Sequence, residues 1–290
     1  MTDASSGEQP ARIFIGTDPS QAIACKLLEY SMRKHTTLPL VFDTMASVAW
    51  PFPKDPKNQP RTEFSFHRFA IPKLAGYHGR ALYVDADMLV FRDLRELWAM
   101  RFDGATVLHA PSSNPLRPKQ FSVMLLDCDR LRWDPEEIVA GLDSGRFDYD
   151  QLVGNVCLEP EEQVQARLPI EWNSLDVHVP GRTALLHYTH IVTQPWVYAR
   201  HPHGDLWVET LVEAIEAGVV AAAEVDDAVR RGWARPSLPR QLRTRRALWP
   251  AFTRGVAPLL DLGFRPHRAL RDRQRRVRRE GPAAVESLRR

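Results

Sequence analysis

The chain has 290 residues, of which 44% are hydrophobic and 26% charged, the composition of an ordinary globular protein with one main core. No stretch reaches the roughly 18 apolar residues of a membrane span, and the polar first residues contain no apolar signal region. We therefore expect a cytoplasmic protein. The cysteines Cys25, Cys128 and Cys157 do not have the spacing of a zinc site, so we expect them to be reduced and buried.

The net charge of +3 is unevenly distributed along the chain. Residues 230–290 contain 18 arginines against four acidic residues, so the remainder carries a charge of about −11. A nucleic-acid enzyme usually carries its positive charge over the active face. The acidic body therefore argues against nucleic acid as a partner, and the basic end needs a separate explanation.

The apolar pattern predicts strands that alternate with helices, which favours a mostly parallel sheet. In chain order we expect a strand at 12–18, a helix at 21–34, a strand at 38–42, a proline-rich loop at 49–60, a helix at 64–75 with Pro72 near a kink or a turn, and strands at 80–84 and 88–90. After these we expect strands at 105–109, 121–127 and 183–188 and helices at 134–142 and 206–217.

Two carboxylates, Asp85 and Asp87, directly follow the buried strand at 80–84. At the carboxyl end of a strand, where ligands of open α/β sheets collect, such a pair can converge on one cation if the chain bends. Oxygen ligands suit Mg²⁺ or Mn²⁺, which fill their other positions with water and phosphate oxygens. A diphosphate is then the natural partner. The alternative is that one aspartate caps a helix or stabilises a turn.

Residues 81–92 (ALYVDADMLVFR) resemble the strand, DxD motif and following apolar segment of glycosyltransferase family 8. Three further blocks resemble family motifs and occur in the family's order: Asp150-Gln151 with Asn155, Leu168-Pro169 with Trp172-Asn173, and His187 with Pro195-Trp196. The resemblance covers residues 12–215, and the ordered set is far more specific than any single block.

The resemblance implies an α/β fold of the GT-A type, with a Rossmann-like, mostly parallel sheet flanked by helices. We expect this catalytic domain to occupy residues 11–229. A disordered N-terminus, residues 1–10, would precede it, and a basic C-terminal extension, residues 230–290, would follow as a helical or partly disordered tail.

The resemblance also implies a donor site. Asp85, Asp87 and His187 would ligate Mn²⁺ or Mg²⁺ across the two phosphates of a donor, with a UDP-sugar expected. The other donor-binding residues implied are Gly16, Thr17 and Asp18 at the base and ribose, Arg68 at the phosphate or sugar, and Ala86 between the aspartates. The alternatives are purely structural roles: a core histidine for His187, a surface salt bridge for Arg68 and a tight turn at Gly16.

Family 8 enzymes retain the anomeric configuration, and the resemblance places Asp150 and Gln151 beside the anomeric carbon. Gln151 cannot act as an acid or base, so it would stabilise the oxocarbenium-like centre or act as a weak nucleophile. Asp150 would orient sugar hydroxyls. Asn173 would contact the acceptor or hold its loop.

Some positions depart from the family pattern. Neutral Gln194 stands where a phosphate-binding lysine is usual, and His190, Arg68 or Arg200 would have to supply the missing charge. Leu152 replaces the last aspartate of the Asp-Gln-Asp motif, and residues 119–123 replace Asn-x-Gly-Val. The donor sugar is therefore open.

Two other functions compete with glycosyl transfer. A sugar nucleotidyltransferase would need a glycine-rich phosphate loop after the first strand, where this chain reads GTDPSQ. A catalytically silent nucleotide-sugar-binding protein is the second alternative. The arginines and large apolar residues after 230 suggest peripheral contact with anionic lipid at the inner face of the membrane, and the alternative is a solvated tail.

Overall fold

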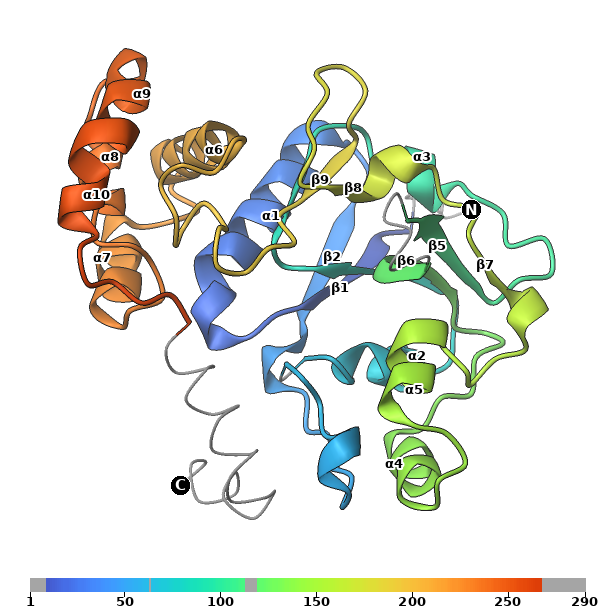
Figure 1. Ribbon diagram of the computed structural model, residues 1–290. Coiled ribbons are helices and arrows are strands. Elements are labelled where there is room, and N and C mark those ends of the chain that lie inside the picture. Colours follow the sequence, from blue (N-terminus) through green and yellow to red (C-terminus); the bar gives the residue numbers. More distant parts are fainter. Residues whose placement is uncertain (1–8, 63, 113–118, 268–290) are drawn as a thin grey trace, which may run out of the picture.

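The computed structural model describes residues 9–62, 64–112 and 119–267 (Figure 1). Most of the N-terminal segment that we predicted to be disordered, residues 1–8, lies outside the described residues, as do residues 268–290 of the basic extension. The predicted α/β fold is confirmed: a central sheet is flanked by helices on both faces.

The central sheet has six strands in the order β2-β1-β3-β6-β5-β7, and only β6 runs antiparallel to its neighbours. The predicted mostly parallel sheet is thereby confirmed. The strands are β1 (Ala11–Gly16), β2 (Leu40–Thr44), β3 (Arg80–Asp85), β5 (Val107–Pro111), β6 (Lys119–Asp127) and β7 (Val164–Gln165). In the parallel pairing of β1 with β3, Gly16 lies opposite Asp85, so both strands end at the same edge.

Beyond that edge the chain enters a second, three-stranded sheet. It contains β4 (Met88–Val90), β9 (Leu185–His187) and β8 (Ser174–Leu175), in the order β4-β9-β8. The predicted strand at 183–188 is therefore β9, which pairs antiparallel with β4 instead of joining the parallel sheet. This pairing places His187 opposite Met88, next to the second aspartate of the DxD motif.

Helices cover both faces of the central sheet. Its strands alternate their buried side chains, so that Ile13 and Ile15 face one core and Phe14 faces the other. On the first face lie α1 (Ala22–His35) and α3 (Arg95–Trp98), and on the second lie α2 (Ile71–Leu74), α4 (Pro135–Asp143) and α5 (Tyr149–Asn155). Asp134 caps α4 by accepting hydrogen bonds from the amides of Glu136 and Glu137.

The single helix predicted over 64–75 is wrong in its form. A 3-10 turn, His67–Ala70, precedes the short α2, and Pro72 lies in the first turn of that helix. Proline has no amide hydrogen and is tolerated in a first helical turn, where that donor would have no partner within the helix. The break therefore follows from Pro72, where the sequence predicts a kink or a turn.

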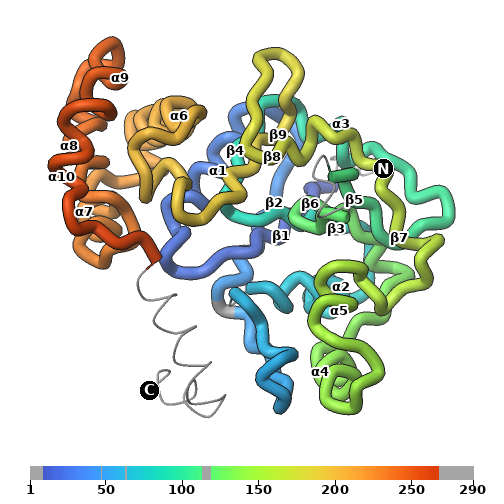
Figure 2. The backbone as a smooth tube through the Cα atoms, in the orientation of Figure 1, coloured from blue at the N-terminus to red at the C-terminus, as the bar shows by residue number. Residues whose placement is uncertain are grey.

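The C-terminal helices pack beside α1 and not on the central sheet (Figures 1 and 2). They are α6 (Gly204–Glu216), α7 (Ala222–Arg230), α8 (Leu238–Leu242), α9 (Trp249–Ala251) and α10 (Ala257–Leu260), with a π-helical turn, Phe252–Val256, before α10. Trp196, Trp207 and Trp249 form a third core with Leu27 of α1. The described part of the basic extension is thus helical and packed against the domain.

All three cysteines are free. Cys25 and Cys128 are buried, as expected, and burial raises the pKa of each thiol to about 12. The expected burial is wrong for Cys157, which is exposed in the segment after α5.

Candidate active site

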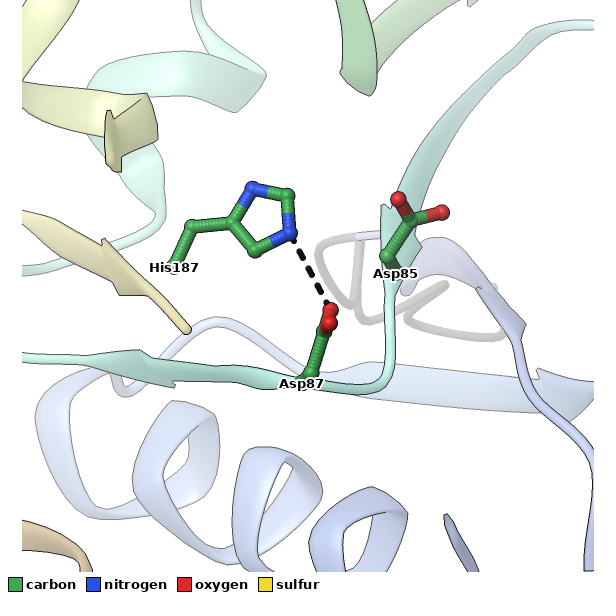
Figure 3. A group of neighbouring side chains, drawn as sticks. All are labelled: Asp85, Asp87 and His187. Atoms are coloured by element: carbon green, nitrogen blue, oxygen red, sulfur yellow. Dashed lines mark ion pairs between the residues drawn. The ribbon is translucent and has the colours of Figure 1, made fainter. Parts of the chain in front are cut away.

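The two aspartates of the DxD motif lie where the chain crosses from one sheet to the other. Asp85 is the last residue of β3, and Asp87 immediately precedes β4 (Figure 3). The amide of Ala86 donates to the carbonyl of Gly16 at 2.9 Å, and the carbonyl of Asp87 accepts from the amide of Tyr188 at 2.9 Å. These bonds bend the chain so that both carboxylates face the space beside His187.

Asp85, Asp87 and His187 form a compact group whose potential ligand atoms lie within 4.8 Å of one another (Figure 3). Nε2 of His187 is 3.2 Å from Oδ1 of Asp87, and that oxygen has no hydrogen-bond partner among the described residues. Two carboxylates and one imidazole are a suitable donor set for Mn²⁺ or Mg²⁺. The structure therefore brings together the three side chains that the family motifs proposed as ligands.

The group contains one partly buried acid, Asp85, one buried acid, Asp87, and a buried histidine. Burial alone would lower the pKa of His187, but the neighbouring carboxylates of Asp87 and Asp85 outweigh it and raise that pKa above its usual value. Burial raises the pKa of Asp85, an effect that Arg68 opposes and Asp87 reinforces. A divalent cation would stabilise both carboxylates in their charged forms.

Tyr83 and Arg68 hold Asp85 from the side of the central sheet. The Tyr83 hydroxyl donates to Oδ1 of Asp85 at 2.5 Å, and burial keeps the pKa of Tyr83 well above its usual value. Nη2 of Arg68 is 3.5 Å from the same oxygen, while Nη1 donates to the carbonyl of Phe121. Arg68 is only 7% exposed, so its interactions are those of a buried side chain and not of a surface salt bridge.

Gly16 lies at the end of β1 in extended backbone, so a tight turn does not explain the glycine. A Cβ atom there would lie 2.2 Å from the Tyr83 hydroxyl, closer than any side-chain contact allows. Thr17 follows as a buried residue, and Asp18 caps the next 3-10 turn by accepting from the amide of Ser20. The three residues predicted for the nucleotide thus lie at the same sheet edge as Asp85.

Asn173 supports His187 from behind. Its Oδ1 is 3.0 Å from Nδ1 of His187, and it is only 2% exposed. Because Asn173 Oδ1 can only accept, Nδ1 carries the hydrogen, and Nε2 points toward Asp87. The two roles predicted for Asn173, contact with the acceptor or support of the loop, stay predictions, and the structure adds its contact with the histidine.

The two predicted catalytic residues lie on α5 but do not share one cavity. Asp150 lines a cavity of about 400 Å³ together with Arg61, Arg68 and Lys119, and it forms an exposed ion pair with Arg61 at 2.6 Å. Gln151 lines a different cavity, and its Oε1 accepts from the amide of Asp148 in a capping box. Arg68 lines the cavity of Asp150 and also contacts Asp85, so this cavity adjoins the metal-ligand candidates. The cavity lined by Gln151 includes none of these residues.

Sequence reasoning missed Tyr83 and gave no structural role to Gln194, which contacts Asp87. A buried tyrosine on a strand carries no signal of its own contact. The signal for Asn173 was present, since it occurs in a family motif one block before His187.

Residues 30–139 match the model of the family described as Glycosyl transferase family 8, the family that the motifs resemble. Protein CDI of Arabidopsis thaliana is 32% identical over 102 residues, an alignment that covers 33% of this chain and 38% of that protein. The match thus spans well under half of the curated relative.

Solved glycosyltransferase structures share the fold. GlyE of Streptococcus pneumoniae TIGR4 aligns with a TM-score of 0.52 and 17% identity over 70% of this chain and 60% of that chain. The bifunctional enzyme WbbM aligns with a TM-score of 0.52 and 15% identity over 74% of this chain and 52% of that chain. An active-site mutant of LgtC aligns with a TM-score of 0.50 and 12% identity over 69% of this chain and 95% of that chain. The predicted GT-A fold is confirmed.

Proposed function

Because residues 30–139 belong to glycosyltransferase family 8, we propose that this chain is a glycosyltransferase that moves a sugar from a nucleotide-diphosphate donor to an acceptor. The observation that carries the proposal is the group of Asp85, Asp87 and His187 at the strand edge of a GT-A fold. The donor we propose is a UDP-sugar, and the cation is Mn²⁺ or Mg²⁺.

Breaking a sugar–phosphate bond leaves negative charge on a diphosphate. A bound divalent cation stabilises that charge without a proton donor. The protein's own contribution is to hold Asp85 and Asp87 as converging carboxylates and to present Nε2 of His187. Gly16, Thr17 and Asp18 at the same edge are proposed to bind the base and ribose, and the buried Arg68 is proposed to contact the phosphate or sugar.

The cavity of about 400 Å³ beside Arg68 is the proposed place of the donor sugar. Asp150 would orient sugar hydroxyls there. We propose transfer with retention of configuration, which is the family's outcome. The role of Gln151 at the anomeric centre stays a prediction, and it requires the Gln151 side chain to leave its capping bond with Asp148.

The proposed metal site is tested by the variant Asp87→Asn, with the exposed Asp129→Asn at the opposite end of the sheet as the matched control. Calorimetry of UDP binding with and without Mn²⁺ is the measurement. We expect Mn²⁺ to raise UDP affinity in the wild type and the control. In Asp87→Asn this gain in UDP affinity should be at least about 10–100-fold smaller, which is the loss typical of removing a residue that only supports a metal ligand.

Equal gains from Mn²⁺ in the Asp87→Asn variant and the wild type would remove Asp87 from the site. If metal has no effect on UDP affinity in any of the three proteins, the donor class itself is wrong.

We propose a cytoplasmic location, which the three free cysteines support, with peripheral contact at an anionic membrane surface. Among the described residues, no helix is long and apolar enough to cross a bilayer. Leu248, Leu259 and Leu262 are 54%, 76% and 86% exposed; Leu259 lies on α10, and the other two lie in turns beside the C-terminal helices. Arg254 of the same region is exposed as well. Trp249 and Phe252 also belong to the large apolar residues after 230, but they are buried in the protein.

A further inference from the structure

Gln194 stands where the family has a lysine, and its side chain is completely buried. Its Nε2 donates to Oδ2 of Asp87 at 2.8 Å and to the carbonyl of Tyr188 at 3.0 Å. Both partners can only accept, so the nitrogen of the amide must lie on this side. The amide therefore binds the oxygen of Asp87 that faces away from His187.

This contact leaves a defined oxygen of Asp87 for a cation. Oδ2 is occupied by Gln194, while Oδ1 faces His187 at 3.2 Å and has no hydrogen-bond partner among the described residues. A hydrogen bond to one oxygen fixes the rotation of the carboxylate, as supporting residues of metal sites commonly do. A buried side chain with no exposed surface is also poorly placed to reach a donor phosphate.

We infer that Gln194 is a positioning residue that orients Asp87 toward the metal, and not a neutral remnant of a phosphate-binding position. The inference rests on the metal site proposed above. Together with Asn173, which holds His187 at 3.0 Å, Gln194 fixes two of the three proposed ligands through neutral amides.

The backbone around Gln194 is fixed as well. Its carbonyl accepts from the amides of Val197 and Tyr198 at 2.9 Å each. The next two carbonyls, of Pro195 and Trp196, accept from Nε and the backbone amide of Arg235 at 3.0 and 2.7 Å. The amide that holds Asp87 is therefore anchored from the C-terminal extension.

The inference is tested by Mn²⁺ affinity measured without nucleotide, on the full chain. Gln194→Met removes both donated hydrogen bonds and keeps an unbranched side chain of similar length. We expect its Mn²⁺ affinity to fall about 10–100-fold, with UDP affinity in the absence of metal unchanged. Gln165→Met is the control, because Gln165 makes a similar bond to the Glu162 carbonyl at 2.7 Å on the distant strand β7.

A second variant, Gln194→Lys, introduces the family residue. A buried ammonium beside Asp87 would pair with that carboxylate and compete with the cation, so we expect weaker Mn²⁺ binding here too. Two results would overturn the inference: unchanged Mn²⁺ affinity in a folded Gln194→Met protein, or metal-free UDP binding that tightens in Gln194→Lys while Mn²⁺ affinity is kept. Failure of the wild type to bind Mn²⁺ would instead contradict the proposed function.

Discussion

The hydroxyl of Tyr83 lies between the end of β1 and the carboxylate of Asp85. It donates to Asp85 at 2.5 Å, and the place it occupies is open only because residue 16 has no side chain. A glycine that the sequence offered as a nucleotide contact or a turn thus has a packing role as well. It allows the tyrosine to reach the proposed metal ligand.

Gly16→Ala should therefore displace the Tyr83 ring. The added Cβ would lie 2.2 Å from the hydroxyl and 2.9 Å from the ring carbon that bears it. We expect a loss of about 1–3 kcal/mol in the free energy of unfolding, the usual cost of overpacking a core. Tyr83→Phe removes the closest atom, so the alanine should cost less in that background.

Denaturant unfolding of the wild type, both single variants and the double variant measures this coupling. An equal cost of Gly16→Ala with tyrosine and with phenylalanine at position 83 would show that the hydroxyl is not what the glycine accommodates.

The resemblance to family 8 predicted which residues gather at the site, and the strand registers explain how they meet. Asp85 ends β3, Asp87 directly precedes β4, and His187 ends β9, which pairs with β4. The support from Gln194 could not be predicted, since it joins residues 107 positions apart with no local pattern. The capping bond of Gln151 was in the sequence, as Asp148 followed three residues later by glutamine.

At the scale of elements, the buried guanidinium of Arg235 joins the C-terminal helices to the segment that follows Gln194. Arg235 is 1% exposed and binds the carbonyls of Pro195 and Trp196 as well as Ser237 and Gln241 of the extension. Burial lowers the pKa of Arg235 to about 10, which leaves it charged at neutral pH. Counting arginines predicted a separate basic tail, because charge alone does not distinguish a buried, fully bonded arginine from a solvated one.

The exposed leucines of these helices carry the proposed membrane contact. Replacing Leu259 and Leu262 together by glutamine should weaken co-sedimentation with anionic vesicles by at least about tenfold, because each leucine contributes about 1.5–3 kcal/mol when buried in an apolar phase. Val177 and Val179, 54% and 45% exposed on a separate loop, provide the control pair for the same substitution.

Binding to vesicles should also weaken as salt is raised, since the arginines attract anionic headgroups. The surface is not a membrane contact if the leucine variant and the valine control sediment with the vesicles to the same extent.

At the scale of the whole molecule, two sheets meet at one edge, and each supplies part of the site. The central sheet supplies Asp85 and the residues around it, and the three-stranded sheet supplies His187. Asp87 lies between the two, directly before β4. The alternation of strands and helices predicted the first sheet. In the second sheet, β4 and β9 correspond to the strands predicted at 88–90 and 183–188. The two-residue β8 and the antiparallel pairing of β4 with β9 could not be predicted, because such short strands carry too little apolar pattern.

The central claim, metal-dependent transfer from a nucleotide-sugar, is tested most directly by NMR of the intact protein with a panel of α-linked UDP- and GDP-sugars. With Mn²⁺, at least one donor should release its nucleoside diphosphate, and the sugar product should first appear as the α anomer. With EDTA in place of Mn²⁺ there should be no release. Formation of pyrophosphate would indicate a nucleotidyltransferase, a first-formed β product would contradict retention, and donor binding without turnover would indicate a silent binding protein.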